Sequence, residues 1–588
     1  MSYDCKIVGG TVVDGTGREG FSANVAIKDG RIVEVGACDG AATRTIDADG
    51  ALVAPGFTDI HTHYDGQVSW DDGMAPSSLH GVTTAVMGSC GVGFAPVRAQ
   101  DHQRLIELME GVEDIPGSAL AEGIKWGWQT FPEYMDAIDA TPHAIDFGVQ
   151  VPHDALRMFV MGDRALPNAP STEDDVARMK AIVREALEAG AVGFSTGRTD
   201  NHRTAQGQAT PASEATEREL CAIAEAFHGL SHGVLQAVSD FDCLVTNDNF
   251  HAEFDLIERM AQASEGHACS LSLMQRDQSP EQWKWITERA EKATAAGTTM
   301  RLQVAPRPIG VLLGLEATFH PFIGYPSYKS ICQLPRAERV ARMRDPEFRT
   351  KLLSEKTDRV AGDGSSIPPL ADHLLAQVDM VAKRLYRLGE TPNYEPDPRT
   401  CLFAEAASTG RTTLEVIYDA LLEDEGRALL YFPLYNFTGL NLDVVHEMLT
   451  HPLALPGLSD GGAHVGTICD ASFPTYLMMH WGRDRHSGRI PIETLIKMQA
   501  YDTARYVGFH DRGAIAVGQR ADINVIDFEK LRLGPPRLVG DLPAGGHRLM
   551  QPAFGYLATL VHGQVIAQGG ELTDARPGRL VRAGQLAA

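Results

Sequence analysis

Short runs of alternating apolar and polar residues fill both ends of the chain, a pattern typical of half-buried β-strands. Residues 24–28 and 31–35 flank Asp29-Gly30, which predicts a hairpin with a two-residue turn. Residues 521–527 have the same strand-like texture. Because the termini of a domain often lie close together, we expect residues 1–56 and 506–588 to form one composite β-sandwich domain.

The pattern changes between residues 57 and 505, where apolar runs alternate with amphipathic helical stretches. This alternation is typical of a parallel α/β sheet or barrel. We therefore predict the α/β class, with a (β/α)8 TIM-type barrel over residues 57–505 and a helical insertion or lid at about 309–400. The barrel strands are expected near residues 83–87, 145–151, 191–194, 233–238, 268–274, 299–304 and 429–432.

A candidate metal site begins at His61-Thr62-His63, where an apolar run ends. Residues i and i+2 of a strand point to the same face, so both imidazoles can reach one metal ion. The pair alone is a weak signal, because two histidines at a strand end can also be purely structural. Cys90 follows the next predicted strand, and Asp460 follows an extended segment late in the chain. Since catalytic groups of α/β barrels lie at the carboxyl ends of strands, we expect these four side chains to meet.

Composition narrows the classes of partner. The net charge of −25 disfavours binding to nucleic acid or to an anionic membrane, both of which need a basic surface. Nine cysteines without a Cys-x-x-Cys pair show no disulfide framework and fit a reducing compartment. Neither a signal peptide nor an 18-residue apolar stretch is visible, so we expect a cytoplasmic protein. We also expect a small-molecule substrate, and the protein could form a homo-oligomer.

Three motifs together resemble the amidohydrolase superfamily: Pro-Gly-Phe-x-Asp-x-His-x-His at 55–63, the late Asp460, and Gly-x-Ile-x-x-Gly-x-x-Ala-Asp-x-x-Val-x-Asp at 513–527. Residues 81–91, Gly-Val-Thr-Thr-x-x-x-Gly-x-Cys-Gly, are similar to the N-acyl-D-amino-acid deacylase (D-aminoacylase) family within it, as is Phe-Ser-Thr-Gly at 194–197. The resemblance spans nearly the whole chain. It implies a (β/α)8 barrel with a small β-sandwich built from both chain ends.

The resemblance also implies a ligand set. It makes His61, His63 and Cys90 metal ligands, and Asp460 both a ligand and the catalytic residue. The family has two further histidine ligands after the next two strands, but 234–240 and 271–277 contain none. Their nearest polar groups are Gln236 and Gln275, and a neutral amide is a poor zinc ligand. We therefore expect one zinc ion rather than two.

The implied activity is metal-dependent cleavage of the amide bond of an N-acyl amino acid, with a D-amino acid favoured by the resemblance. Water activated by the metal would attack, with Asp460 as general base and then general acid. The substrate carboxylate needs an arginine, for which Arg198, Arg203 and Arg307 are candidates. Further substrate contacts are expected from His202, Gln275, Tyr435, Asn436 and His464.

Two alternatives remain open from the residues. The protein could be an amidohydrolase acting on a cyclic or other amide, since altered ligands can accompany altered chemistry. It could also be a barrel that has lost its metal and serves in binding or assembly.

Overall fold

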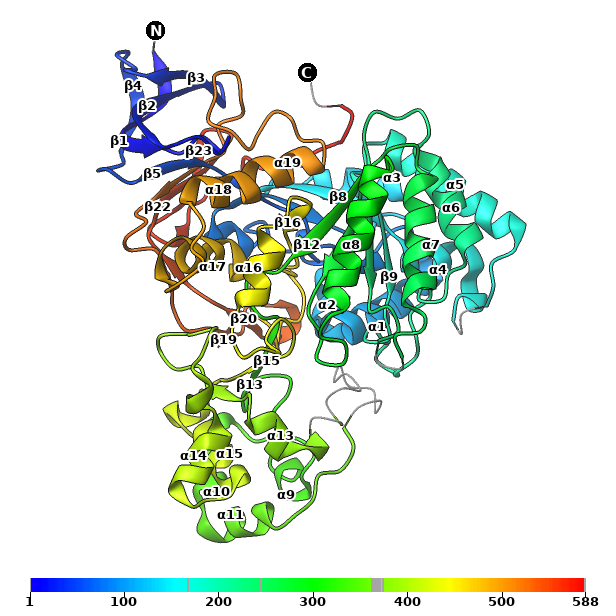
Figure 1. The fold of residues 1–588 in the computed structure, drawn as a ribbon, viewed down its shortest axis with the longest axis vertical. Coiled ribbons are helices and arrows are strands. Elements are labelled where there is room, and N and C mark those ends of the chain that lie inside the picture. The colour runs from blue at the N-terminus through cyan, green and yellow to red at the C-terminus, as the bar shows by residue number, and fades with distance from the viewer. Residues whose placement is uncertain (1, 167–168, 244–245, 361–371, 373–374, 586–588) are drawn as a thin grey trace.

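The computed structural model describes residues 2–166, 169–243, 246–360, 372 and 375–585. A β-rich domain carries the N-terminus at the top left of Figure 1, the barrel lies to its right, and a helical insertion projects below.

The predicted barrel is confirmed as a sheet of eight parallel strands in the order β16-β12-β11-β10-β9-β8-β7-β6. A parallel bridge between Thr62 and Gly461 joins the chain after the first strand to the chain after the last. Seven strands therefore follow one another in sequence, and the late β16 completes the set. The bounds are β6 Phe57–Asp59, β7 Val82–Met87, β8 Asp146–Pro152, β9 Gly193–Arg198, β10 Val234–Ser239, β11 Cys269–Leu273, β12 Met300–Val304 and β16 Ala454–Pro456.

Amphipathic helices cover the outside of this sheet (Figure 1). One of these helices is α5, Glu173–Glu188, which begins at a capping box between Thr172 and Asp175. Its apolar face packs into the main hydrophobic core through Met179, Val183 and Leu187. The other helices on this side are α1 His102–Glu113, α2 Gly117–Gly123, α3 Phe131–Asp139, α4 His153–Met161, α6 Glu217–Ala224, α7 Phe250–Gln262, α8 Gln282–Ala295 and α16 Asp443–Leu449.

Strands from both ends of the chain form one nine-stranded sheet, in which β5 lies between β1 and β17. Both parts contribute to one apolar core, for example Val25 and Val53 beside Val525 and Leu560. The hairpin at Asp29-Gly30 is confirmed, because Lys28 pairs with Arg31 and both turn residues have positive φ. The bounds are β1 Tyr3–Val12, β2 Phe21–Lys28, β3 Arg31–Gly36, β4 Ala42–Asp47, β5 Leu52–Pro55, β17 Ile523–Ile526, β22 Tyr556–Val561, β23 Gln564–Gln568 and β24 Glu571–Leu572.

The insertion between β12 and β16 has its own hydrophobic core and extends beyond the predicted residue 400. The prediction of a barrel strand at residues 429–432 is wrong. That segment is β15, Leu430–Pro433, which pairs antiparallel with β13 and β14. A short apolar run has the same pattern in either sheet, so only the three-dimensional pairing separates them. The remaining bounds are β13 Gly310–Leu313, α9 Pro326–Lys329, α10 Arg336–Arg344, α11 Pro346–Leu353, α13 Val378–Ala382, β14 Tyr386–Arg387, α14 Leu402–Thr409 and α15 Thr413–Leu421.

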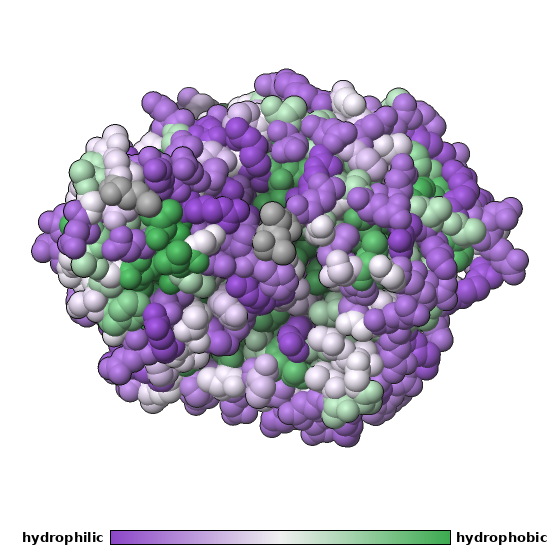
Figure 2. Space-filling model, turned by 90° about the horizontal axis from the view of Figure 1, so that it is seen from above, coloured by the Kyte–Doolittle hydropathy of each residue, from purple (hydrophilic) through white to green (hydrophobic). Residues whose placement is uncertain are grey.

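After β16 the chain returns to the β-rich domain through α17 Phe473–Tyr476, α18 Ile492–Ile496 and α19 Thr503–Tyr506. Near its end, Leu580 forms a parallel bridge with Phe147 of β8. The face seen in Figure 2 is mostly hydrophilic, with apolar residues in separate patches. Among the described residues, no helix is long and apolar enough to cross a membrane.

Candidate active site

The two histidines of the opening motif lie just beyond β6, on extended chain held from both sides. The Thr62 amide donates to the Val86 carbonyl at 3.0 Å, and the His63 amide donates to the Gly461 carbonyl at 2.8 Å. Both imidazoles are 1% exposed, and their ring centroids are 5.6 Å apart. They therefore face the same buried point, as the i, i+2 spacing predicts.

Cys90 lies in a tight turn after β7 that depends on glycine at both sides. Gly88, Cys90 and Gly91 all have positive φ. A Cβ at Gly91 would lie 2.7 Å from the backbone nitrogen of Gly197, so only glycine fits this close approach. The turn directs the Cys90 Sγ to within 3.1 Å of His61 Nε2. One donor atom from each of His61, His63 and Cys90 lies within 4.8 Å of the others.

Asp460 reaches the same point from the loop after β16. Its amide donates to the His61 carbonyl at 3.2 Å, which ties the loop directly to the histidine segment. The Asp460 Oδ1 lies 3.3 Å from His61 Nε2 and 3.6 Å from His63 Nε2. This oxygen is buried and has no hydrogen-bond partner among the described residues.

The electrostatics of this cluster favour a cation. Burial lowers the pKa of His61, but the Cys90 sulfur and Asp460 outweigh it and raise that pKa to about 9. Burial alone would raise the pKa of Asp460, yet the imidazoles of His63 and His61 hold it well below its usual range. A divalent ion can replace the protons that these imidazoles hold.

Amide side chains support the cluster from inside the barrel. Gln303 of β12 places Oε1 2.7 Å from His61 Nδ1, so this nitrogen donates and leaves Nε2 facing Cys90. Gln236 of β10 accepts from the Cys90 amide at 3.1 Å. The amide of Gln236 is therefore already used in holding the Cys90 turn.

A cavity of about 450 Å³ opens above the cluster. The part of its lining around the cluster is polar, and we call it the polar end. We call the apolar part of the lining the apolar wall, and it is formed by Val238, Met274, Ile309, Val311, Phe319, Leu434, Leu458 and Ile468. The insertion supplies several of these residues, including Val311 of β13. Among the described residues that line the cavity, Arg276 is the one lysine or arginine.

Of the predicted substrate contacts, His202, Tyr435 and His464 line this cavity. Gln275 and Asn436 do not line it. The backbone N–H of Gln275 donates to Asn436 Oδ1 at 2.8 Å, and these two residues link the end of β11 to the loop after β15. Successive residues of an extended chain point to opposite sides, so the side chain that enters the cavity is the next one, Arg276.

The three arginines predicted to bind a carboxylate are engaged elsewhere. Arg198 pairs with Glu253 through Nε and Nη2. Arg203 pairs with Asp200 in its own loop, at 2.6 Å. Arg307 is buried, binds Asp470 and lies 3.5 Å above the ring of Tyr394.

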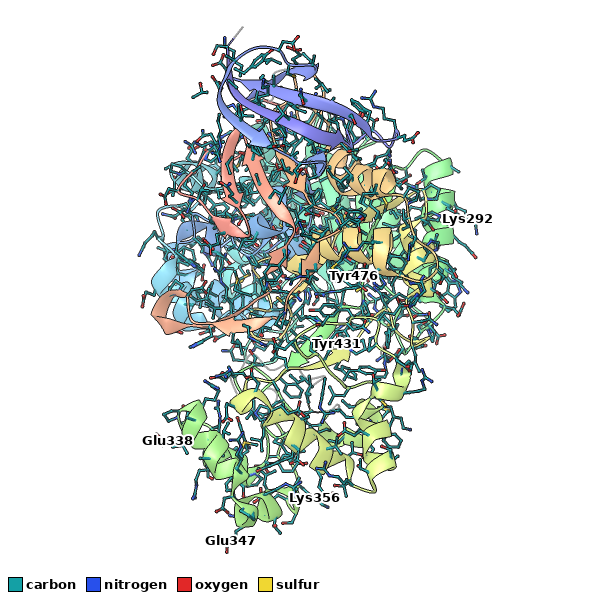
Figure 3. The ribbon with its side chains drawn as sticks, turned by 90° about the vertical axis from the view of Figure 1, so that its left-hand side faces the viewer. Lys292, Glu338, Glu347, Lys356, Tyr431 and Tyr476 are labelled. Atoms are coloured by element: carbon teal, nitrogen blue, oxygen red, sulfur yellow. The ribbon has the colours of Figure 1, made fainter. Side chains whose placement is uncertain are left out.

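The ring of Tyr394 packs between two further tyrosines, at 5.1 and 5.8 Å. Figure 3 shows these, Tyr431 and Tyr476, where the insertion below joins the rest of the chain above. Arg307 and these three tyrosines therefore hold the insertion to the rest of the chain. The charge of Arg307 is already matched by Asp470.

Three residues at or below the cavity were not predicted from the sequence: Glu113, Arg276 and Gln303. A signal exists for Gln303, because it is a polar residue inside an apolar strand that ends at the site. Arg276 stands one position from the predicted Gln275. Glu113 ends a helix outside the barrel strands, and no local pattern marks it as part of the site.

Known proteins share this architecture. A family model described as "Amidohydrolase family" matches residues 44–567. An uncharacterized protein of Mycobacterium tuberculosis is 26% identical over 641 residues, which cover 100% of this chain and 97% of that protein. The D-aminoacylase of Alcaligenes xylosoxydans xylosoxydans is 35% identical over 196 residues, or 33% of this chain and 38% of that enzyme.

A solved structure has a similar fold over the full chain. The N-acyl-D-glutamate deacylase of Bordetella bronchiseptica, complexed with zinc and a phosphonate inhibitor, aligns with a TM-score of 0.62 and 22% identity. The alignment covers 99% of this chain and 100% of that one. The family match, which spans most of the sequence, shows that this chain belongs to the amidohydrolase family, hydrolases of carbon–nitrogen bonds.

Proposed function

We propose that the protein is a metal-dependent deacylase that cleaves the amide bond of N-acyl amino acids. The observation that carries this proposal is the convergence of His61, His63, Cys90 and Asp460 at the polar end of a largely apolar cavity. Imidazole and thiolate donors in this combination suit zinc. The unpartnered Asp460 Oδ1 fits a fourth ligand.

We also propose one ion rather than two. A second ion beside Cys90 would need donors from β10 and β11. The cavity-lining residues there are Val238 and Ser272, and Gln236 already binds the Cys90 amide. Neither a valine nor a hydrogen-bonded amide replaces an imidazole.

A divalent ion in this position would polarise an amide carbonyl and lower the pKa of water to about 7. Asp460 faces both imidazoles at the cavity floor, so its carboxylate can take a proton from water and return it to the leaving nitrogen. Gln303 and the Cys90 turn hold the ligands in place while this happens. The apolar wall limits competing water.

Arg276 supports an anionic substrate. It is 3% exposed, and no carboxylate of the described residues lies within 4.0 Å of its guanidinium. Its Nη1 and Nη2 donate to the neutral oxygens of Gln282 and Ser239, and its Nε has no partner. A buried arginine without a counter-charge is costly, which favours a substrate carboxylate over a neutral cyclic amide. The D-aminoacylase relative favours the D configuration.

The test combines metal analysis with substrates. The purified protein should hold about one zinc per chain and hydrolyse N-acyl D-amino acids in a panel that also contains L-isomers and cyclic amides. Asp460→Asn should retain most of the zinc and lower kcat by about 10²- to 10⁴-fold, the usual contribution of a general base. Near-wild-type turnover in Asp460→Asn, or no hydrolysis anywhere on the panel, would contradict the proposal.

A further inference from the structure

Glu113 is a buried carboxylate in an unfavourable place. It is the last residue of α1, His102–Glu113, and it is 1% exposed. The negative end of the helix dipole lies at this terminus, and burial removes the hydration of the charge. Such a carboxylate destabilises the fold unless a positive or donating group faces it.

Two imidazoles face Glu113. Its Oε1 lies 3.3 Å from His63 Nδ1, and its Oε2 lies 3.5 Å from His464 Nε2. The Oε1 and the His63 Nδ1 are both buried and have no hydrogen-bond partner among the described residues. The opposite nitrogen of His63, Nε2, faces Asp460. The imidazole of His63 therefore lies between Glu113 on one side and Asp460 on the other.

The end of α1 is held firmly enough to direct this carboxylate. The next residue, Asp114, has φ 51° and accepts hydrogen bonds from Thr318 at 3.0 Å and Thr467 at 2.9 Å. The His464 amide donates to the Glu113 carbonyl. A Cβ at Gly111 would lie 2.3 Å from the backbone nitrogen of Ala205, so the helix end also packs tightly against the loop after β9. The barrel loop, the insertion and α1 thus meet at this point.

We propose that Glu113 is a positioning residue, which holds the His63 proton on Nδ1 so that Nε2 is free for the metal ion. Through His464 it also ties the loop that carries Asp460 to the same point. A carboxylate behind a ligating histidine fixes the tautomer and ring orientation and makes the ligand more basic. This inference rests on the metal site proposed above.

The two histidines then differ in their support. His61 Nδ1 is held by the neutral amide of Gln303, and His63 Nδ1 faces a charged carboxylate. Glu113→Gln imitates the support of His61, because it keeps an acceptor and removes only the charge. Glu113→Leu removes both. The pair therefore separates the effect of the negative charge from the effect of a polar acceptor at this position.

The experiment titrates the full-length, chelator-stripped protein with Zn²⁺ and Co²⁺ against a competing chelator. We expect Glu113→Gln to weaken metal affinity about 10-fold and Glu113→Leu about 100-fold, the range found for partners behind metal ligands. The Cys90-to-Co²⁺ charge-transfer band should persist in both variants, while the ligand-field bands shift. The stoichiometry should stay at one ion per chain.

Glu107→Gln, on the half-buried part of the same helix, is the matched control and should leave affinity and spectra unchanged. Thermal unfolding of the metal-free proteins separates positioning from a structural role, since Glu113→Gln should be as stable as the wild type or more stable. Affinity within twofold of the wild type, or a clear loss of metal-free stability, would overturn the inference. So would a wild type that binds two ions and a variant that binds one, because Glu113 would then be a ligand. Failure of the wild type itself to bind metal would instead remove the proposed function.

Discussion

The two ends of the cavity are built by different parts of the chain. The polar end comes from residues just beyond barrel strands, in turns where backbone hydrogen bonds and close glycine contacts leave little freedom, as around Cys90. The apolar wall comes largely from the insertion and from loops, with side chains such as Val311 and Leu434 that make only packing contacts there. The proposed chemistry and the proposed choice of substrate therefore depend mainly on different parts of the chain.

The largest effect should come from removing a donor at the polar end. Cys90→Ser replaces a thiolate by a weaker ligand, and the zinc affinity should fall by more than the roughly 100-fold that an outer partner contributes. Equilibrium dialysis with zinc measures this loss, with Cys221→Ser on α6 as the control. A zinc affinity that survives in Cys90→Ser would show that the polar end does not depend on this turn.

An intermediate effect is expected at Arg276, the arginine that lines the cavity. Arg276→Gln removes the charge but keeps a donor, so kcat/KM for N-acyl amino acids should fall about 10- to 100-fold, the equivalent of one charged hydrogen bond. The corresponding uncharged amides should be affected much less. Arg301→Gln serves as the control, because Arg301 stands near the start of β12 and does not line the cavity. An equal loss for charged and uncharged substrates would assign Arg276 a structural role.

The smallest effect should come from the apolar wall. Leu434→Ala removes apolar contact area, which should raise KM a few-fold for substrates with bulky apolar groups and leave kcat and zinc content unchanged. A series of acyl chain lengths measures the change, with the exposed Leu440→Ala as the control. A fall in kcat with an unchanged KM would show that the two ends are coupled more tightly than their separate construction suggests.

The sequence could predict the groups whose positions follow from local geometry. His61 and His63 share one face because of their spacing, and Cys90 stands in a glycine-rich turn immediately after a strand. The groups at the polar end could therefore largely be predicted from the sequence, and their role as a metal site remains a prediction. The barrel and the composite β domain were visible in the same way, because strand and helix periodicities are local.

Groups placed by long-range packing could not be predicted. Glu113 reaches His63 only because α1 packs beside the mouth of the barrel, and β15 joins the insertion because its partners are β13 and β14. Arg276, which we propose as the carboxylate-binding arginine, was missed for a related reason. Arg198 and Arg307 have acidic partners, Glu253 and Asp470, that lie far away in the sequence, and these partners cannot be identified from spacing.

The pairing of β5 with β17 has a consequence for how the molecule is made. Val53 pairs with Val525, and the histidine segment begins only a few residues after β5. A ribosome synthesises His61 and His63 long before β17, Ile523–Ile526, the strand that pairs with β5 just ahead of them. Contacts so distant in sequence form slowly. The strand that leads into the histidine segment can therefore complete its pairing only after β17 has been synthesised, so this part of the scaffold closes late in folding.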